Sequence, residues 1–175
     1  MRIIGRIALF VVVVVLLLLV GSLFIPSTWQ VKSATAIKAQ PMDVFEVVSD
    51  LKTWEQWAIN PAGNHSVSSR SYHGAESGEG AVMKWSEGKM EGVITMVNVS
   101  APSAIEYDVS INGGKQTMKG YFEFMPDAEG TRVAWIFTGT DANPVSKYRM
   151  LIYKSKIENG FVAGLAKLKA RWEKN

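Results

Sequence analysis

The sequence predicts an α+β domain that follows one N-terminal transmembrane helix. Three features support this fold class: a long apolar run without charges, a series of alternating segments separated by turn residues, and an amphipathic helix near the end. A twisted antiparallel sheet has one face that must be covered, and one long helix can cover it. We therefore expect a curved antiparallel sheet of about seven strands against a C-terminal helix. Residues 1–28 form the expected anchor and linker, and residues 29–175 form the expected domain.

The anchor is predicted from the run between Ile7 and Ile25, which only Gly21 and Ser22 interrupt. As a helix this run measures about 28 Å, close to the roughly 30 Å hydrocarbon core of a bilayer. A cleaved signal peptide is the competing interpretation, but its apolar region is usually shorter and ends at a small-residue cleavage site. The nearest such pattern, at residues 34–36, lies inside a predicted strand. We therefore expect the anchor to remain uncleaved.

Basic residues flank the predicted span unequally. Arg2 and Arg6 precede it together with the α-amino group, whereas Lys32 and Lys38 follow it. The positive-inside rule therefore favours a single-pass protein with a cytoplasmic N-terminus and an extracytoplasmic domain. The linker at residues 26–28 reaches only on the order of 10 Å, so the domain is expected close to the bilayer surface.

The domain is predicted to begin with a strand and a helix. Residues 29–39 alternate between apolar and polar side chains, as a half-buried strand does. Trp29, just after the linker, is a candidate interfacial anchor. Pro41 suits the first position of the following helix, and Asp43 suits its first turn. A short helical turn is expected at residues 53–57.

Six further strands are expected before the C-terminal helix. They are predicted at residues 65–73, 79–86, 89–100, 104–112, 116–126 and 131–140. The turn residues between them are typical of an antiparallel meander. The final helix is expected in two parts, the first from Pro144 to about Tyr153. The second carries an apolar stripe from Ile157 to Trp172.

Several segments in this order resemble the polyketide cyclase/dehydrase branch of the START-like superfamily, also called SRPBCC. The segments are residues 39–45, 50–57, 78–80 with Trp85, 130–135 and 161–169. The resemblance implies the helix-grip fold, with a hydrophobic pocket between the sheet and the C-terminal helix. The family includes lipid and sterol carriers and cyclases, and it has no universal catalytic motif to place on this sequence. Fold membership alone does not fix an activity.

The pocket predicts a set of ligand-binding candidates. These are the apolar faces of the strands, the two tryptophans of the short helical turn and the stripe of the C-terminal helix. The candidates are Trp54, Trp57, Met83, Trp85, Tyr107, Met118, Phe122, Phe124, Trp135, Phe137, Phe161, Leu165 and Leu168. Methionine and aromatic side chains suit adaptable contact with an apolar ligand. The alternative interpretation is that the same side chains simply fill the core.

Composition and charge exclude several kinds of site. The chain has no cysteine, which excludes disulfides, thiolate metal sites and cysteine nucleophiles. His65 and His73 have no apparent third ligand, so we expect no metal and no cofactor. Basic residues are concentrated between Lys147 and Lys174. The usual interpretation is a helix face exposed to solvent, and the alternative is attraction of this helix to anionic lipid. No nucleic-acid motif accompanies them.

The leading functional hypothesis is a membrane-held binding module for a lipid or other apolar small molecule. One alternative is an enzyme of the cyclase or hydrolase kind, for which Tyr107, His73 and Glu106 are the first residues to inspect. Another is a protein-interaction module of the cell envelope that uses the basic helix or residues 150–153. No catalytic residue and no protein partner is assigned from the sequence.

Overall fold

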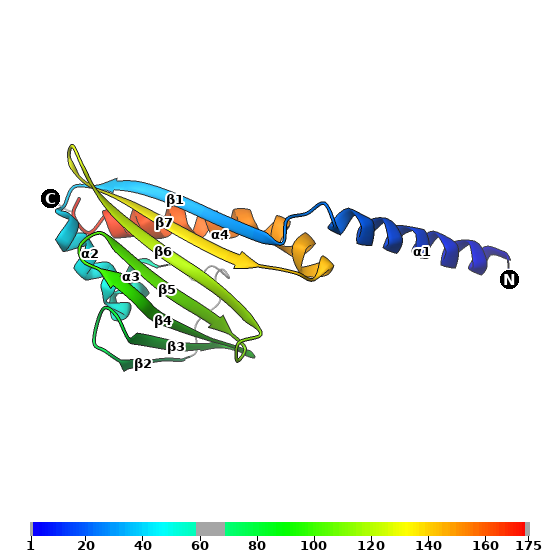
Figure 1. Ribbon diagram of the computed structural model, residues 1–175, viewed down its shortest axis with the longest axis horizontal. Coiled ribbons are helices and arrows are strands. Elements are labelled where there is room, and N and C mark those ends of the chain that lie inside the picture. The colour runs from blue at the N-terminus through cyan, green and yellow to red at the C-terminus, as the bar shows by residue number, and fades with distance from the viewer. Residues whose placement is uncertain (1, 59–68, 174–175) are drawn as a thin grey trace.

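The computed structural model describes residues 2–58 and 69–173 and has the expected α+β architecture (Figure 1). The elements in chain order are α1 (Arg2–Ser22), β1 (Thr28–Ile37), α2 (Pro41–Ser49), the 3-10 turn η1 (Leu51–Thr53), α3 (Trp54–Trp57), β2 (Ser69–Gly74), β3 (Ala81–Glu87), β4 (Met90–Ser100), β5 (Ala104–Ile111), β6 (Gln116–Asp127), β7 (Gly130–Thr140) and α4 (Pro144–Lys169). The strands from β3 onward begin and end within two residues of the predicted positions. Residues 65–68, the start of another predicted strand, lie outside the described residues.

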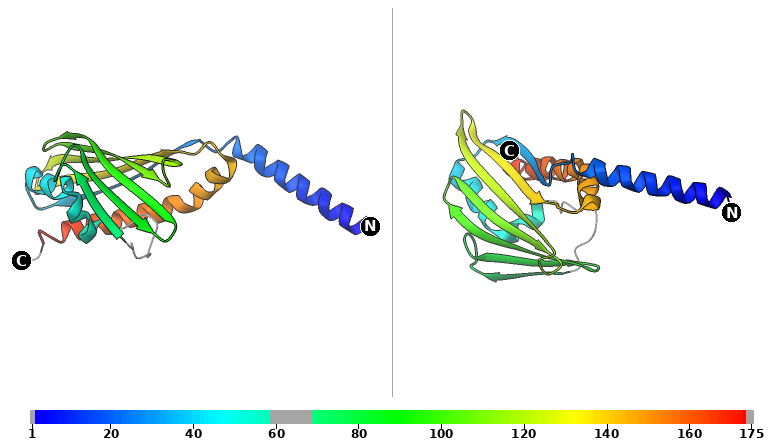
Figure 2. Two further views of the ribbon diagram at one scale, coloured as in Figure 1. Left: turned by 90° about the horizontal axis from the view of Figure 1, so that it is seen from below. Right: turned by 45° about the vertical axis from the view of Figure 1, so that its right-hand side comes forward.

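The strands form one antiparallel sheet in the order β1-β7-β6-β5-β4-β3-β2. Strands β2 to β7 follow one another as a meander. Strand β1 forms the other edge of the sheet and pairs with β7, with Thr28 opposite Thr140. A bulge between Met96 and Asn98 interrupts the register of β4 against β5. Bulges increase the local twist of a strand. The sheet is strongly curved, and α4 runs along its concave side (Figure 2).

The C-terminal helix is one continuous element, which corrects the two-part helix predicted from the sequence. Asn143 caps its start, since the side-chain oxygen accepts a hydrogen bond of 2.8 Å from the backbone N–H of Val145. No proline follows Pro144 inside the helix, and its two glycines, Gly160 and Gly164, each cost about 1 kcal/mol relative to alanine. Burial of the second half of the helix offsets that cost.

The core lies between the concave face of the sheet and three helical elements, α2, α3 and the second half of α4. Helix α2 buries Val44 and Val48 completely, as its apolar face predicts. Thr131 joins this region to the sheet, because its hydroxyl donates a 2.7 Å hydrogen bond to the carbonyl of Ala39. The elements around α2 and α3 therefore hold one end of the sheet firmly against α4.

Candidate functional site

A partly open cavity of about 1810 Å³ lies between the concave face of the sheet and the first half of α4. Small-molecule pockets are typically about 300–1,000 Å³, so this space can hold a large ligand. Its walls come from the strands of the sheet, from α3, and from the side of α4 that faces the sheet. The volume and the shape of the sheet make it the leading binding site in the described part of the chain.

The cavity lies at the end of the sheet to which α1 is attached. Thr28 and Thr140, which pair at the ends of β1 and β7, both line it. Gly88, in the turn between β3 and β4, and Lys115, in the turn between β5 and β6, line it as well. Figure 1 shows these turns at the α1 side of the domain and α2 at the opposite side. The cavity therefore lies at the domain end nearest to the N-terminal helix.

Aromatic rings close the cavity at its inner end. Trp135 stacks on Phe161 of α4, with ring centroids 3.8 Å apart and an interplanar angle of 3°. Trp54 meets Tyr107 edge-on at 5.1 Å, and its indole N–H donates a 2.8 Å hydrogen bond to the carbonyl of Val48. These rings contact neighbours on several elements, so we expect them to keep their positions at the inner end of the cavity.

Three aromatic rings on the concave face lie over glycines of the neighbouring strand. The pairs are Trp29 with Gly139, Trp85 with Gly92, and Tyr107 with Gly120. A Cβ atom on Gly92 would lie only 2.0 Å from the Trp85 ring, and a Cβ atom on Gly120 would lie 1.9 Å from the Tyr107 ring. An aromatic residue opposite a strand glycine is a known way to cover the exposed backbone. All three rings line the cavity.

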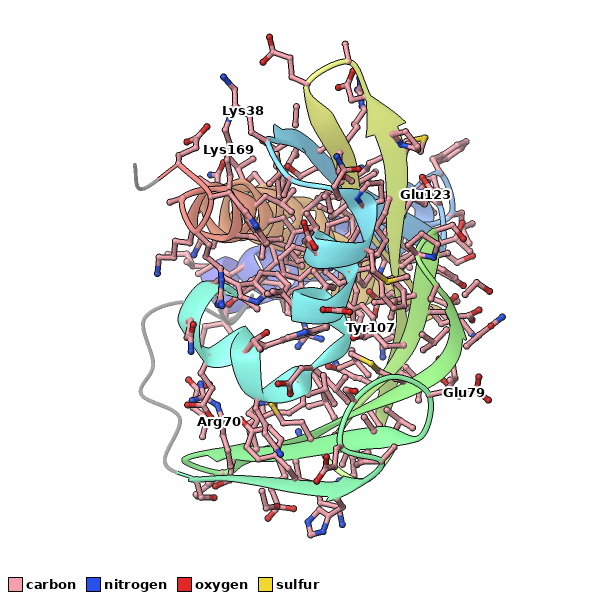
Figure 3. The ribbon with its side chains drawn as sticks, turned by 90° about the vertical axis from the view of Figure 1, so that its left-hand side faces the viewer. Lys38, Arg70, Glu79, Tyr107, Glu123 and Lys169 are labelled. Carbon is pink, nitrogen blue, oxygen red and sulfur yellow. The ribbon has the colours of Figure 1, made fainter. Side chains whose placement is uncertain are left out.

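Tyr107 brings a polar group into this apolar region. Its hydroxyl oxygen accepts a 2.7 Å hydrogen bond from the indole N–H of Trp135. Burial raises the pKa of Tyr107, so the hydroxyl is neutral at ordinary pH. Figure 3 shows Tyr107 in the middle of the domain, whereas Glu79 and Glu123 lie at its periphery. Among the described residues, its own hydrogen has no acceptor.

Polar contacts join α3 to the edge strand β2 at the side of the cavity. Arg70 and Glu55, which both line the cavity, form an ion pair with a nitrogen–oxygen distance of 3.1 Å. The Tyr72 hydroxyl donates a hydrogen bond to the same carboxylate. Burial, followed by this hydrogen bond, raises the pKa of Tyr72 to about 12. These contacts fix the position of β2 relative to α3.

Comparison with known proteins identifies the fold family. The sequence profile described as polyketide cyclase/dehydrase and lipid transport matches residues 28–173. The chain belongs to this family. The resemblance found in the sequence is therefore confirmed. No curated protein matches the chain.

Solved structures share the fold of the family at low sequence identity. The KanY protein has a TM-score of 0.62 and 18% identity over 83% of this chain and 98% of its own. The major latex-like protein 151 of Panax ginseng has a TM-score of 0.59 and 13% identity over 83% of this chain and 98% of its own. A protein in the dynemicin biosynthetic locus has a TM-score of 0.56 and 18% identity, over 83% of this chain and 47% of its own.

The predicted ligand-binding residues separate into two groups in this family fold. Those that line the cavity are Trp54, Met83, Trp85, Tyr107, Met118, Trp135, Phe137 and Phe161. Those that do not line it are Trp57, Phe122, Phe124, Leu165 and Leu168, which are buried in the core beyond its inner end. Both groups share the same sheet face and helix stripe, so alternation alone could not separate them. Ligand contact by the first group stays a prediction.

Other cavity residues were not anticipated from the sequence. Trp29 was considered as an interfacial anchor, but its ring lies over Gly139 and its indole N–H donates a 3.0 Å hydrogen bond to Asp141. Met150 and Tyr153, on the first half of α4, also line the cavity. They extend the predicted helix stripe toward its N-terminus at helical spacing, and this signal was present in the sequence.

His73 and Glu106, which were also considered for chemistry, do not line the cavity. His73 is exposed, and one of its ring nitrogens lies 3.1 Å from the Ser71 hydroxyl. Glu106 forms a 2.9 Å ion pair with Lys119. His65 lies outside the described residues. Within residues 2–58 and 69–173, no cluster of three or more histidine or acidic side chains is placed to hold a metal ion.

Proposed function

We propose that the protein binds a lipid or another apolar small molecule in the cavity beneath α4. The observation that carries this proposal is the large cavity lined by methionine and aromatic side chains. The family description, which includes lipid transport, supports the same conclusion. The free hydroxyl hydrogen of Tyr107 favours a ligand with one acceptor oxygen on a largely apolar body.

We also propose that residues 1–28 hold this binding domain, residues 29–175, at a membrane. The segment from Ile3 to Ser22 forms a helix with a mean hydropathy of 3.2, and its side chains are exposed apart from those at its C-terminal end, where Ser22 is buried. The basic residues that precede the uncharged apolar run, Arg2 and Arg6, favour a cytoplasmic N-terminus. Mass measurement of the mature N-terminus, together with carbonate extraction of membranes, tests this part. A mature chain that begins after α1 would contradict it.

A matched pair of variants on β6 tests ligand binding. Met118 lines the cavity, whereas Met125 lies on the outside of the same strand with 43% of its surface exposed. Met118→Trp fills part of the cavity, and Met125→Trp adds the same bulk on the outer face of the sheet, away from the cavity. The full chain is extracted in detergent, and bound molecules are identified by native mass spectrometry. We expect the unaltered chain and Met125→Trp to retain a ligand and Met118→Trp to lose it; equal occupancy would overturn the proposal.

Catalysis is the second candidate, and Tyr107 is the observation that favours it. Its neutral hydroxyl is held by Trp135 and is free to donate a hydrogen bond, so it is suited to polarise a carbonyl group in the cavity. The family description includes cyclases and dehydrases. Recovered ligand is compared by mass spectrometry before and after incubation with the unaltered chain and with Tyr107→Phe. Conversion of the ligand by the unaltered chain but not by Tyr107→Phe would establish catalysis. A ligand that is unchanged after incubation with either chain would show that the protein binds it without converting it.

A further inference from the structure

The end of α1 is bonded to the start of α4. The Lys147 ammonium donates hydrogen bonds to the carbonyls of Ser22 at 3.1 Å and Ile25 at 2.9 Å. The Tyr148 hydroxyl donates a 2.9 Å hydrogen bond to the carbonyl of Leu18. The last carbonyls of a helix lack partners within it, and a cation there is favourable. Lys147 therefore caps the apolar helix with a side chain from the folded domain.

Two further contacts make this junction close. A Cβ atom on Gly21 would lie 2.6 Å from the Tyr148 hydroxyl, so the glycine leaves room for the tyrosine. The backbone N–H of Asp141 donates a 2.7 Å hydrogen bond to the carbonyl of Ser27. The linker is thus bonded to the loop before α4, and α1 and α4 are held at a defined relative position. Figure 2 shows both helices diverging from this junction.

The first half of α4 exposes apolar and basic side chains close to the junction. Val145 and Ile152 are 75% and 67% exposed, and Leu151 between them is exposed as well. The exposed basic residues of this half are Arg149, Lys154 and Lys156. A helix surface that combines exposed apolar and basic residues is typical of helices that lie in a membrane interface. At about 1.5 Å per residue, Ile152 is only about 8 Å along the axis from Lys147.

We propose that one face of this half-helix, which we call the α4 platform (Val145 and Ile152 with Arg149 and Lys156, which share a face at helical spacing), lies on the bilayer leaflet that α1 enters. The occupant is anionic lipid, because the platform is basic and its apolar side chains lie beside the end of an apolar helix. The cavity lies at the same end of the domain, so its ligand is a membrane lipid or a molecule dissolved in the bilayer. This inference rests on the proposed anchoring and deepens the proposed binding function.

The chain has no cysteine, so single-cysteine variants report one position each. Ile152→Cys samples the platform, and Val162→Cys is a matched control on α4 with 54% of the native side chain exposed. Leu16→Cys, inside α1, reports whether the anchor is inserted. The full chain, labelled with a fluorophore, is placed in phosphatidylglycerol-containing vesicles whose acyl chains carry bromine quenchers. We expect several-fold stronger quenching at position 152 than at position 162, and the strongest quenching at position 16.

The outcomes separate the two proposals. Equal quenching at positions 152 and 162, with strong quenching at 16, would overturn the platform and leave the anchor intact. Weak quenching at 16 would overturn the anchor and the platform together. The quenching measurements do not depend on a bound ligand. The ligand-binding proposal is therefore tested separately, by the loss of ligand in Met118→Trp.

The variant Tyr148→Phe tests the junction itself. It removes the hydrogen bond from the Tyr148 hydroxyl to Leu18, and we expect it to reduce quenching at position 152 while quenching at position 16 is retained.

Discussion

At the α2 and α3 end of the sheet, the inward side chains of β6 and β7 are covered by tryptophans, whereas at the α1 end the same strands line open space. Phe122 and Met118 illustrate the difference. Both point inward from β6, but Phe122 is fully buried under Trp54 and Met118 lines the cavity. One continuous sheet face thus serves as core at one end and as a cavity wall at the other. The covering elements, not the strands, determine which role a residue has.

The largest effect is expected from truncating the closed end. Phe122→Ala removes a ring that contacts Trp54 and stacks on Trp135, so it should lower the free energy of unfolding by about 3–5 kcal/mol. Met118→Ala, on the same face of the same strand, should cost less than about 1.5 kcal/mol because its side chain already borders open space. Denaturant unfolding followed by tryptophan fluorescence measures both. Similar losses would mean that the two ends are packed alike.

Glycines under the aromatic rings provide the second comparison. In Gly120→Ala the new methyl group would collide with Tyr107, and we expect a loss of about 1–3 kcal/mol from the displaced ring. Gly160→Ala is the control, because a Cβ there meets nothing within 4 Å and the helix gains up to about 1 kcal/mol. The two variants should shift the midpoint of thermal unfolding in opposite directions. A neutral Gly120→Ala would show that the ring has room to move.

Much of this fold was predictable because its determinants are local. Alternation along the strands, Pro41, Pro144 and the turn glycines depend on neighbouring residues, and these elements were placed within a few positions. The boundary between core and cavity was not predictable from alternation. It depends on where Trp54 lies against Phe122, and that contact joins segments far apart in the chain. Gly92 and Gly120 inside strands were local signs of close aromatic approach.

The pH dependence of stability tests the buried tyrosine at the inner end of the cavity. The raised pKa of Tyr107 means that the native state keeps its proton above pH 10, whereas the unfolded chain releases it at a pKa of about 10. Its contribution to stability is therefore complete below pH 10 and is lost as the pH rises further, by up to about 1.4 kcal/mol per pH unit. Tyr72, with a pKa of about 12, acts in the same direction. We expect Tyr107→Phe to lose stability less steeply above pH 10; an unchanged slope would contradict its burial.

The smallest effect is expected at the side of the cavity, where Arg70 pairs with Glu55. Their side chains are 32% and 41% exposed, so water and salt screen the pair. A double-mutant cycle of Arg70→Met and Glu55→Gln should give a coupling energy of about 0.2–1 kcal/mol that falls as salt is raised. Tyr72→Phe, which removes the second contact to Glu55, is the control that separates the hydrogen bond from the ion pair. A coupling energy above that range, unaffected by salt, would mean that the ion pair is shielded from water and contributes strongly to holding β2 against α3.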